Sequence, residues 1–284
     1  MEKVKITIIG SGQNVDRFMI ENETNEYIKI IGQIPDGALN TKTSDLDLAL
    51  LSACDLSFAV GYSKIIPTAI CNNSLIVNLH GGILPKWRGF SSNAWAVMNG
   101  EKTIGYSLHR VTSTLDDGLL YFVKHIPIGD EETMSDVHQK MIDSIIRDCP
   151  EILYKISKGL LKGKQQCCAD IAYCTRFDAQ MGTLKDFSMP AQYYVNLYRC
   201  MAKPLGSGIY FQFKGNTYSV GKVEHGKKYG AANYLCAEGK IVNIEADSVW
   251  VKVRDSVIVL SDLQKNGTRV QPYACFKNGQ RLGD

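Results

Sequence analysis

Short apolar runs alternate with helix-like segments through the first 80 residues, and this alternation restricts the fold more than any other feature. Runs rich in β-branched residues, which favour strands, occupy residues 3–10, 27–34, 55–62 and 74–80. Residues 11–23 and 44–54 have helical character, and Ser44 is suited to cap the second segment. Strands separated by helices predict an α/β domain with a Rossmann-like, mostly parallel sheet.

The rest of the chain changes character near residue 165. Up to there the pattern predicts a helix, two strands around a polar turn, and a long helix bent near Pro150. From Gly206 onward short strands alternate with turn residues, which predicts a small all-β, OB-like barrel. We therefore expect a first domain over residues 1–165, a connecting segment and helix over 166–204, and the β domain over 205–284.

Composition excludes several classes of protein. The net charge is +3 and the lysines are scattered, whereas nucleic-acid-binding proteins usually carry a basic stripe. No apolar run approaches the length of a membrane span, and the first residues lack the layout of a signal peptide. Nine cysteines without a secretory signal indicate reduced thiols, and the one cluster, Cys167, Cys168 and Cys174, has no histidine beside it. We expect a cytoplasmic protein with no metal, nucleic-acid or membrane partner.

Polar residues end the fourth predicted strand, in the sequence LIVNLHGGILPKWRG at residues 75–89. Asn78 and His80 are two residues apart, so on a strand their side chains point to the same face. They lie at the carboxyl end of the strand, where open α/β sheets form their ligand crevice. Gly81 and Gly82 have no Cβ, so a ligand or another backbone can approach closely.

A second polar focus is the turn at residues 115–118, Leu-Asp-Asp-Gly, between two apolar strands. An amide, an imidazole and a carboxylate together suit attack on a carbonyl carbon, with the amide stabilising the oxyanion and the imidazole moving the proton. No G-x-S-x-G nucleophile is present, which favours direct transfer over an acyl-enzyme. Spacing alone leaves a purely structural role for Asn-x-His and for the turn equally open.

The two motifs together resemble the signature of the folate-dependent formyltransferases. NLHGGILPKWRG is similar to the Asn-x-His, Leu-Leu-Pro and Arg-Gly pattern of that family, and LDDG is similar to its Asp-x-Gly turn. The spacing in the family selects Asp116 rather than Asp117 as the aspartate. The resemblance implies catalytic roles for Asn78, His80 and Asp116, and 10-formyltetrahydrofolate as the formyl donor.

The resemblance also implies further contacts. Folate-binding residues expected from it are Tyr62, Gly82, Ile83, Leu84, Pro85, Thr112 and Leu115. Trp87 and Arg88 are expected beside the entrance for the acceptor, although Arg88 is equally suited to fix the loop. Structural roles for Tyr62 and Leu84 also stay open.

The acceptor implied by the resemblance is the primary amine of a nucleotide-linked deoxyamino sugar, used for a surface polysaccharide such as lipopolysaccharide O-antigen. The segment SSNAWAVMNGEKTIGYSLHRV (91–111) is similar to the nucleotide-sugar branch, while the tail resembles the C-terminal barrel of methionyl-tRNA formyltransferases. Only about twenty residues separate the second and third strands, which is shorter than in the tRNA and purine branches. The loop reads Gly-Gly-Ile-Leu where many members have Pro-Ser-Leu-Leu, so a serine hydroxyl is missing.

Three alternatives remain from the sequence. A methionyl-tRNA formyltransferase would use the same folate site. A formyltetrahydrofolate hydrolase uses a similar triad but usually has an additional amino-terminal regulatory domain, whereas this chain begins on its first strand. A dinucleotide-binding module is suggested by IIGSGQ, which lacks the full G-x-G-x-x-G. The nucleotide, the sugar and the amine position are not specified by the sequence, and a homodimer through the β domain is left open.

Overall fold

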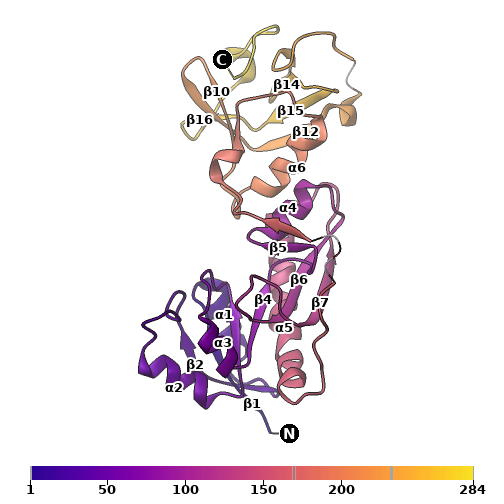
Figure 1. The fold of residues 1–284 in the computed structure, drawn as a ribbon. Helices are drawn as coiled ribbons and strands as arrows, with labels where there is room; N and C mark the ends of the chain where they lie inside the picture. Colours follow the sequence, from indigo (N-terminus) through magenta and orange to yellow (C-terminus); the bar gives the residue numbers. More distant parts are fainter. Residues whose placement is uncertain (1, 168, 170, 231–232, 284) are drawn as a thin grey trace. The chain divides into compact units, whose positions relative to one another are not determined.

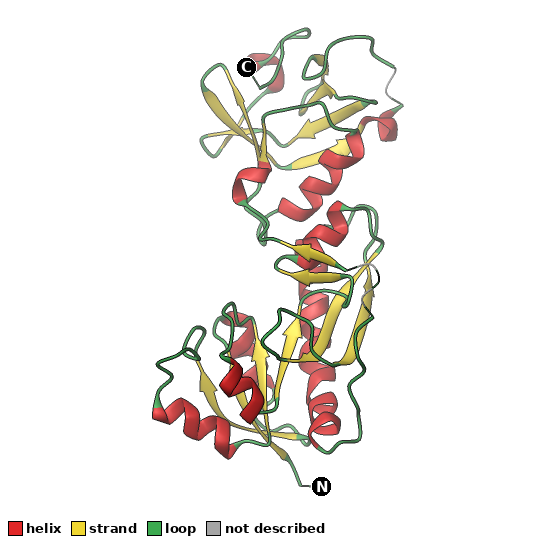
Figure 2. Cartoon of the chain, viewed as in Figure 1, coloured by secondary structure: helices red, strands yellow, loops and turns green. Residues whose placement is uncertain are grey.

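The computed structural model describes residues 2–167, 169, 171–230 and 233–283, and the chain divides into two compact units (Figures 1 and 2). The first unit consists of Met1–Trp95, Thr103–Ile128 and His138–Arg176, and the second of Ala96–Lys102, Gly129–Val137 and Phe177–Asp284. This division differs from the expected boundaries at 165 and 204. Segments 96–102 and 129–137 fold with the second unit, which a linear reading of the sequence does not anticipate.

The first unit contains a six-stranded sheet of order β2-β1-β3-β4-β6-β7. Its strands are β1 (Val4–Ile9), β2 (Ile28–Ile34), β3 (Leu56–Val60), β4 (Ile76–His80), β6 (Thr103–Arg110) and β7 (Leu120–Pro127). The first four are parallel, whereas β6 is antiparallel to both β4 and β7. The predicted α/β class with a mostly parallel sheet is confirmed, with an antiparallel pair at one edge.

Helices cover both faces of this sheet. On one face, Phe18 of α1 (Gln13–Glu21) meets Phe58 of β3, with ring centroids 5.3 Å apart, and Arg17 pairs with Asp143 of α5 (Met134–Ser157) at 2.7 Å. On the other face, side chains of α2 (Asp45–Ala53) and α3 (Thr68–Asn73) join one apolar cluster with residues of β1, β3 and β4. As predicted, Ser44 caps α2 by accepting a hydrogen bond from the Asp47 amide.

Two very short strands complete this unit. β5 (Trp87–Gly89) pairs in parallel with β8 (Ala172–Cys174), so a segment expected to be a connection is tied to the loop after β4. Three residues are too few for a period to be visible, which is why the pattern does not reveal β8. The helix α4 (Ser92–Met98) follows β5, and α5 continues through Pro150.

The second unit is mainly β, as predicted. One sheet has the order β17-β16-β11-β10-β9 and another the order β12-β15-β14-β13. Their bounds are β9 Thr183–Leu184, β10 Ile209–Phe213, β11 Asn216–Val220, β12 Lys222–His225, β13 Ile241–Ile244, β14 Ser248–Lys252, β15 Val257–Ser261, β16 Gln264–Lys265 and β17 Thr268–Arg269. Two α-helices, α6 (Ala191–Met201) and α7 (Pro272–Cys275), accompany them. Hairpin turns at Lys214-Gly215-Asn216 and Ala246-Asp247-Ser248 join β10 to β11 and β13 to β14.

Phe18→Ala should lower the free energy of unfolding by about 3–5 kcal/mol, since the ring is 1% exposed and its removal leaves a cavity against Phe58. The control is Ile20→Ala on the same helix, where the side chain is 73% exposed and the change should stay within about 0.5 kcal/mol. Urea unfolding followed by circular dichroism measures both. Equal losses for the two variants would contradict this packing.

Candidate active site

Strand β4 carries its residues from the core directly into a cavity. The side chains of Ile76, Asn78 and His80, at every second position of the strand, point to the same face of the sheet, which α2 and α3 cover. Ile76 is fully buried in the apolar cluster there, whereas Asn78 and His80 line a cavity of about 580 Å³ in the first unit. The strand therefore places an amide and an imidazole side by side where the cover of the helices ends, as the sequence predicts.

The wall of the cavity comes from the carboxyl ends of neighbouring strands. The loop after β3 contributes residues 61–66, including Tyr62, and the segment after β6 contributes residues 111–116, including Thr112 and Leu115. The Tyr62 hydroxyl donates to the Leu39 carbonyl at 3.1 Å, and burial raises the pKa of this phenol. A volume of this size is typical of pockets for organic ligands.

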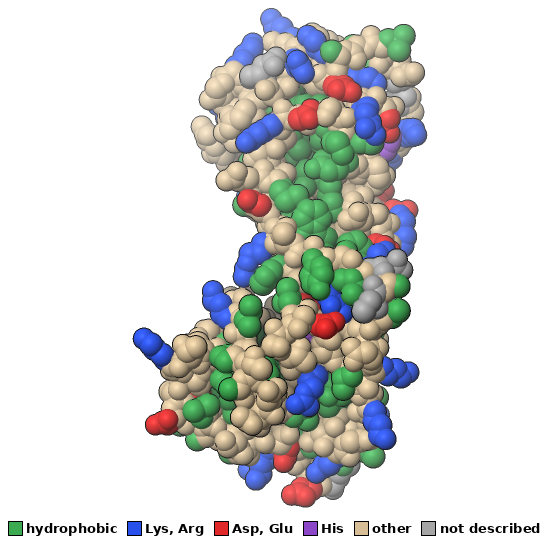
Figure 3. Space-filling model, viewed as in Figure 1, with side chains coloured by type: hydrophobic (Ala, Val, Ile, Leu, Met, Phe, Trp, Pro, Cys, Tyr) green, Lys and Arg blue, Asp and Glu red, His purple; other side chains and the backbone are tan. Residues whose placement is uncertain are grey.

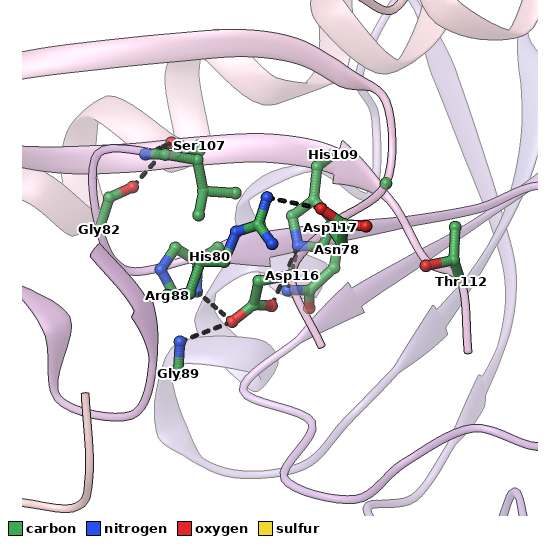
Figure 4. A network of polar contacts seen from close by, with 12 residues as sticks. Asn78, His80, Gly82, Arg88, Gly89, Ser107, His109, Thr112, Asp116 and Asp117 are labelled. Atoms are coloured by element: carbon green, nitrogen blue, oxygen red, sulfur yellow. Dashed lines mark hydrogen bonds and ion pairs between the residues drawn. The ribbon is translucent and has the colours of Figure 1, made fainter. Parts of the chain in front are cut away.

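Asp116 is joined to the other site residues by its carboxylate (Figure 4). One oxygen, Oδ2, lies 3.4 Å from Nδ1 of His80 and accepts a hydrogen bond from the Gly89 amide at 2.8 Å. The other oxygen, Oδ1, lies 3.3 Å from Nε2 of His109. Asp116 is 8% exposed, so its carboxylate is buried. The structure also brings the three predicted residues Asn78, His80 and Asp116 together at one cavity.

The backbone at Asp116 is held in an unusual conformation. Its φ is +49°, a left-handed value that aspartate tolerates better than most residues. Gln166 donates from Nε2 to the carbonyls of Asp116 and Gly118, both at 2.8 Å. A Cβ on Gly118 would lie 1.9 Å from the Arg110 carbonyl oxygen, so the turn requires glycine there. These contacts fix the direction of the Asp116 side chain.

The protonation states follow from burial and from these contacts. Burial lowers the pKa of His80 below its ordinary value, although Asp116 and the Trp87 carbonyl act in the opposite direction. Burial raises the pKa of Asp116, but hydrogen bonds and charge from His109, His80 and Gly89 outweigh it and leave the pKa lowered. At neutral pH the site therefore holds a neutral imidazole beside an ionised carboxylate. Because a carbonyl only accepts, Nε2 of His80 donates to Trp87 at 2.6 Å, and Nδ1 faces Asp116.

His109 is a site residue that the sequence reasoning missed. It is 3% exposed and lies on β6 directly opposite Asn78 on β4, with its Nε2 3.1 Å from Nδ2 of Asn78. The available signal was its position in the predicted strand 104–111, within the GYSLH sequence. Antiparallel pairing of that strand with 74–80 would have revealed the neighbour, but order within a sheet is not visible in one sequence.

The loop residues Gly82, Ile83, Leu84 and Pro85 are not among the residues that line the cavity. Ser107 of β6 donates from its hydroxyl to the Gly82 carbonyl at 2.7 Å and accepts from the Leu84 amide at 3.0 Å, which ties the loop to the sheet. A Cβ on Gly82 would lie 2.8 Å from Nε2 of His80. Glycine at 82 thus leaves room for the His80 imidazole. Folate contacts by these four residues stay a prediction.

Trp87 and Arg88 are buried, at 8% and 2% exposed, and neither lines the cavity. The Arg88 guanidinium lies 2.6 Å from Asp117 and donates to Gln166 at 3.0 Å. Arg88 therefore fixes the loop against the turn that carries Asp116, which is the alternative left open by the sequence. Contact of either residue with an acceptor stays a prediction.

A metal site and a membrane-spanning helix are both absent from the described part of the chain. No group of three or more histidine, cysteine or acidic side chains is arranged to hold a metal ion there; Cys168 of the cysteine cluster lies outside that part. No helix among the described residues is both long and apolar enough to cross a membrane.

Comparisons with known proteins agree with this arrangement. Residues 40–149 match the formyl transferase family model, and residues 181–281 match the model of the formyl transferase C-terminal domain. The chain belongs to the folate-dependent formyltransferase family and is an enzyme of formyl transfer that uses 10-formyltetrahydrofolate.

Among curated relatives, the methionyl-tRNA formyltransferase of Bartonella quintana is 27% identical over 232 residues, covering 81% of this chain and 73% of the relative. That of Alcanivorax borkumensis is 24% identical, covering 87% and 74%.

Solved structures share the fold at lower identity. WlaRD, described as a sugar 3N-formyltransferase, has a TM-score of 0.65 and 17% identity, with 94% of this chain and all of that chain covered. HypX from Aquifex aeolicus has a TM-score of 0.66 and 15% identity, with 93% of this chain covered. This chain spans about half of HypX, 46% of its length.

The lowered pKa of His80 gives a direct prediction. The ring should titrate with a midpoint below about 6.5, the ordinary value for histidine. At a pH between the pKa of His80 in the folded protein and its pKa in the unfolded chain, the unfolded chain binds a proton that the folded protein does not. The contribution of His80 to stability therefore falls as the pH drops below about 6.5. Proton–carbon NMR of the ring, assigned by the signal lost in His80→Gln, measures the midpoint. A midpoint at or above 6.5 would contradict the burial argument.

Proposed function

We propose that this enzyme transfers the formyl group of 10-formyltetrahydrofolate to the primary amine of a nucleotide-linked deoxyamino sugar, a precursor of a surface polysaccharide. The observation that carries the chemistry is the group formed by the half-buried Asn78 with the buried His80 and Asp116, at the wall of a cavity large enough for an organic ligand. Family membership supports formyl transfer by this group.

In the proposed reaction the neutral amine attacks the formyl carbon and forms a tetrahedral intermediate. Asn78 donates a hydrogen bond to the developing oxyanion, which preorganised donors stabilise strongly. His80 takes a proton from the attacking nitrogen at Nδ1, where the Asp116 carboxylate 3.4 Å away stabilises the imidazolium. The bond from carbon to N10 then breaks, N10 takes up a proton, and the products are a formamide and tetrahydrofolate.

The folate is proposed to lie along the loop after β3 and the segment after β6. Three large apolar side chains of the cavity wall are partly exposed, which suits a flat ring: Ile65 at 77%, Phe90 at 37% and Leu115 at 47%. Tyr62 and Thr112 line the same cavity. Gly82, Ile83, Leu84 and Pro85 do not line this cavity, so folate contacts by them are supported by the family resemblance alone.

Structural neighbours support a sugar acceptor. WlaRD was solved with dTDP and 5-N-formyl-THF, and an N-formyltransferase from Helicobacter canadensis with folinic acid and dTDP-3-aminofucose. This chain covers 100% and 99% of those two chains. In this chain β2 and β3 are joined by residues 35–55, which contain the helix α2.

The second candidate function is formylation of methionyl-tRNA, which the names of the curated relatives favour. Two properties weigh against it. The net charge is only +3, and on the face shown in Figure 3 the lysines and arginines are scattered over each unit. Protein–tRNA binding relies on clustered positive charge facing the phosphates.

The catalytic assignment predicts that His80→Ala and Asp116→Asn fold normally but lose at least about a hundredfold in kcat, as for loss of one member of a coupled group. His125→Gln is the control, because this histidine is exposed on β7 and outside the cavity. Turnover is followed by release of tetrahydrofolate, and folding by circular dichroism. Near-normal kcat in either site variant would refute the assignment.

The acceptor is tested with a panel of dTDP-, UDP- and GDP-linked amino sugars incubated with 10-formyltetrahydrofolate. We expect tetrahydrofolate and a formamide in equal amounts with at least one sugar, and little reaction with charged initiator tRNA. Activity with tRNA alone would select the second candidate, and free formate without any acceptor would indicate a hydrolase instead.

A further inference from the structure

His109 is held by backbone as well as by side chains. Its Nδ1 lies 2.9 Å from the carbonyl of Arg110, and since a carbonyl only accepts, Nδ1 carries a proton. This leaves Nε2 as the one ring nitrogen available to the site. The ring is 3% exposed and stands edge-on to His80, with centroids 6.3 Å apart.

That one nitrogen contacts two different catalytic groups. Nε2 lies 3.1 Å from the amide nitrogen of Asn78 and 3.3 Å from Oδ1 of Asp116. In the neutral ring it accepts a hydrogen from Asn78, which determines how the amide is turned. In the protonated ring it donates to Asp116. The same nitrogen therefore locates the Asn78 amide when the ring is neutral and the Asp116 carboxylate when the ring is protonated.

We propose that His109 is a positioning residue for formyl transfer, which orients the Asn78 amide toward the oxyanion and holds Asp116 in register with His80. The proposal rests on the proposed catalytic roles of these three residues. The titratable groups that face His109 are Asp116 from the turn and His80 from β4. One oxygen of the carboxylate accepts from the Gly89 amide and faces Nδ1 of His80, and the other lies beside Nε2 of His109.

A structural role alone has a different consequence. A histidine that only fills the core would affect stability, and its replacement by an apolar residue of similar size would leave the remaining enzyme active. A positioning residue affects kcat more than KM, because Asn78 and the His80–Asp116 pair act mainly in the transition state. The two roles are separable by experiment.

The test compares His109→Leu, which removes the nitrogen, with His109→Gln, which keeps a polar group near it. We expect His109→Leu to lower kcat by about 10–100-fold, typical for loss of a group that orients a catalytic residue, with KM for the formyl donor changed less than about threefold. His109→Gln should lose less than about tenfold. The control is again His125→Gln, on the neighbouring strand and exposed, which should behave as wild type.

A second readout needs no acceptor. Burial is the main cause of the lowered pKa of His80, and the positive charge of a protonated His109 adds to it, so replacing His109 should move the NMR midpoint of the His80 ring to higher pH. A moved midpoint in a protein that transfers no formyl group would refute the proposed function but keep the positioning role. If His109→Leu does not fold, His109→Gln carries the test. An unmoved midpoint, together with a kcat within twofold of wild type in the folded variant, would overturn the proposal.

Discussion

The carboxylate of Asp116, buried between two imidazoles, is the interaction on which the rest of the site depends. Burying an ionised carboxylate is costly unless each oxygen finds a partner. Here the Gly89 amide and His80 face one oxygen and His109 the other, and these partners keep the pKa lowered in spite of burial. An ionised carboxylate in this place favours the protonated form of the neighbouring His80 imidazole, against the effect of burial.

This arrangement explains features of the fold that lie outside the cavity. The Gly89 amide is placed by the short pairing of β5 with β8, and the turn that carries Asp116 is fixed by Gln166, a residue fifty positions later in the chain. Arg88 of β5 contacts both Asp117, in the same turn as Asp116, and Gln166. The segment beyond α5 therefore returns to the catalytic turn. It acts as a support for the site as well as a connection between two units.

Much of this could be predicted from the sequence, and the failures share a physical cause. Strand and helix positions in the first unit follow from local periodicity, and the alternation along β4 is enough to place Asn78 and His80 on one face. Asp116 was selected by the spacing of the family motif. His109, Gln166 and β8 act through pairing between segments distant in sequence, and such pairing leaves no local pattern. Gly82 is expected to let a ligand or another backbone approach, and in the structure the space is occupied by the Ser92 side chain, the His80 ring and the Trp87 backbone carbonyl.

The strands β4 and β6 contribute different residues to the site, and the contacts between these residues depend on how the two strands are paired. β4 carries Asn78 and His80, the groups proposed to act on the formyl carbon, whereas β6 carries His109 and Ser107, which contact the Asn78 amide and the loop that follows β4. Because the two strands are antiparallel neighbours with Asn78 opposite His109, a one-residue slip would separate every one of these pairs. The register of β4 against β6 is thus fixed by the same contacts that position Asn78, and the antiparallel part of the sheet contributes to the candidate site.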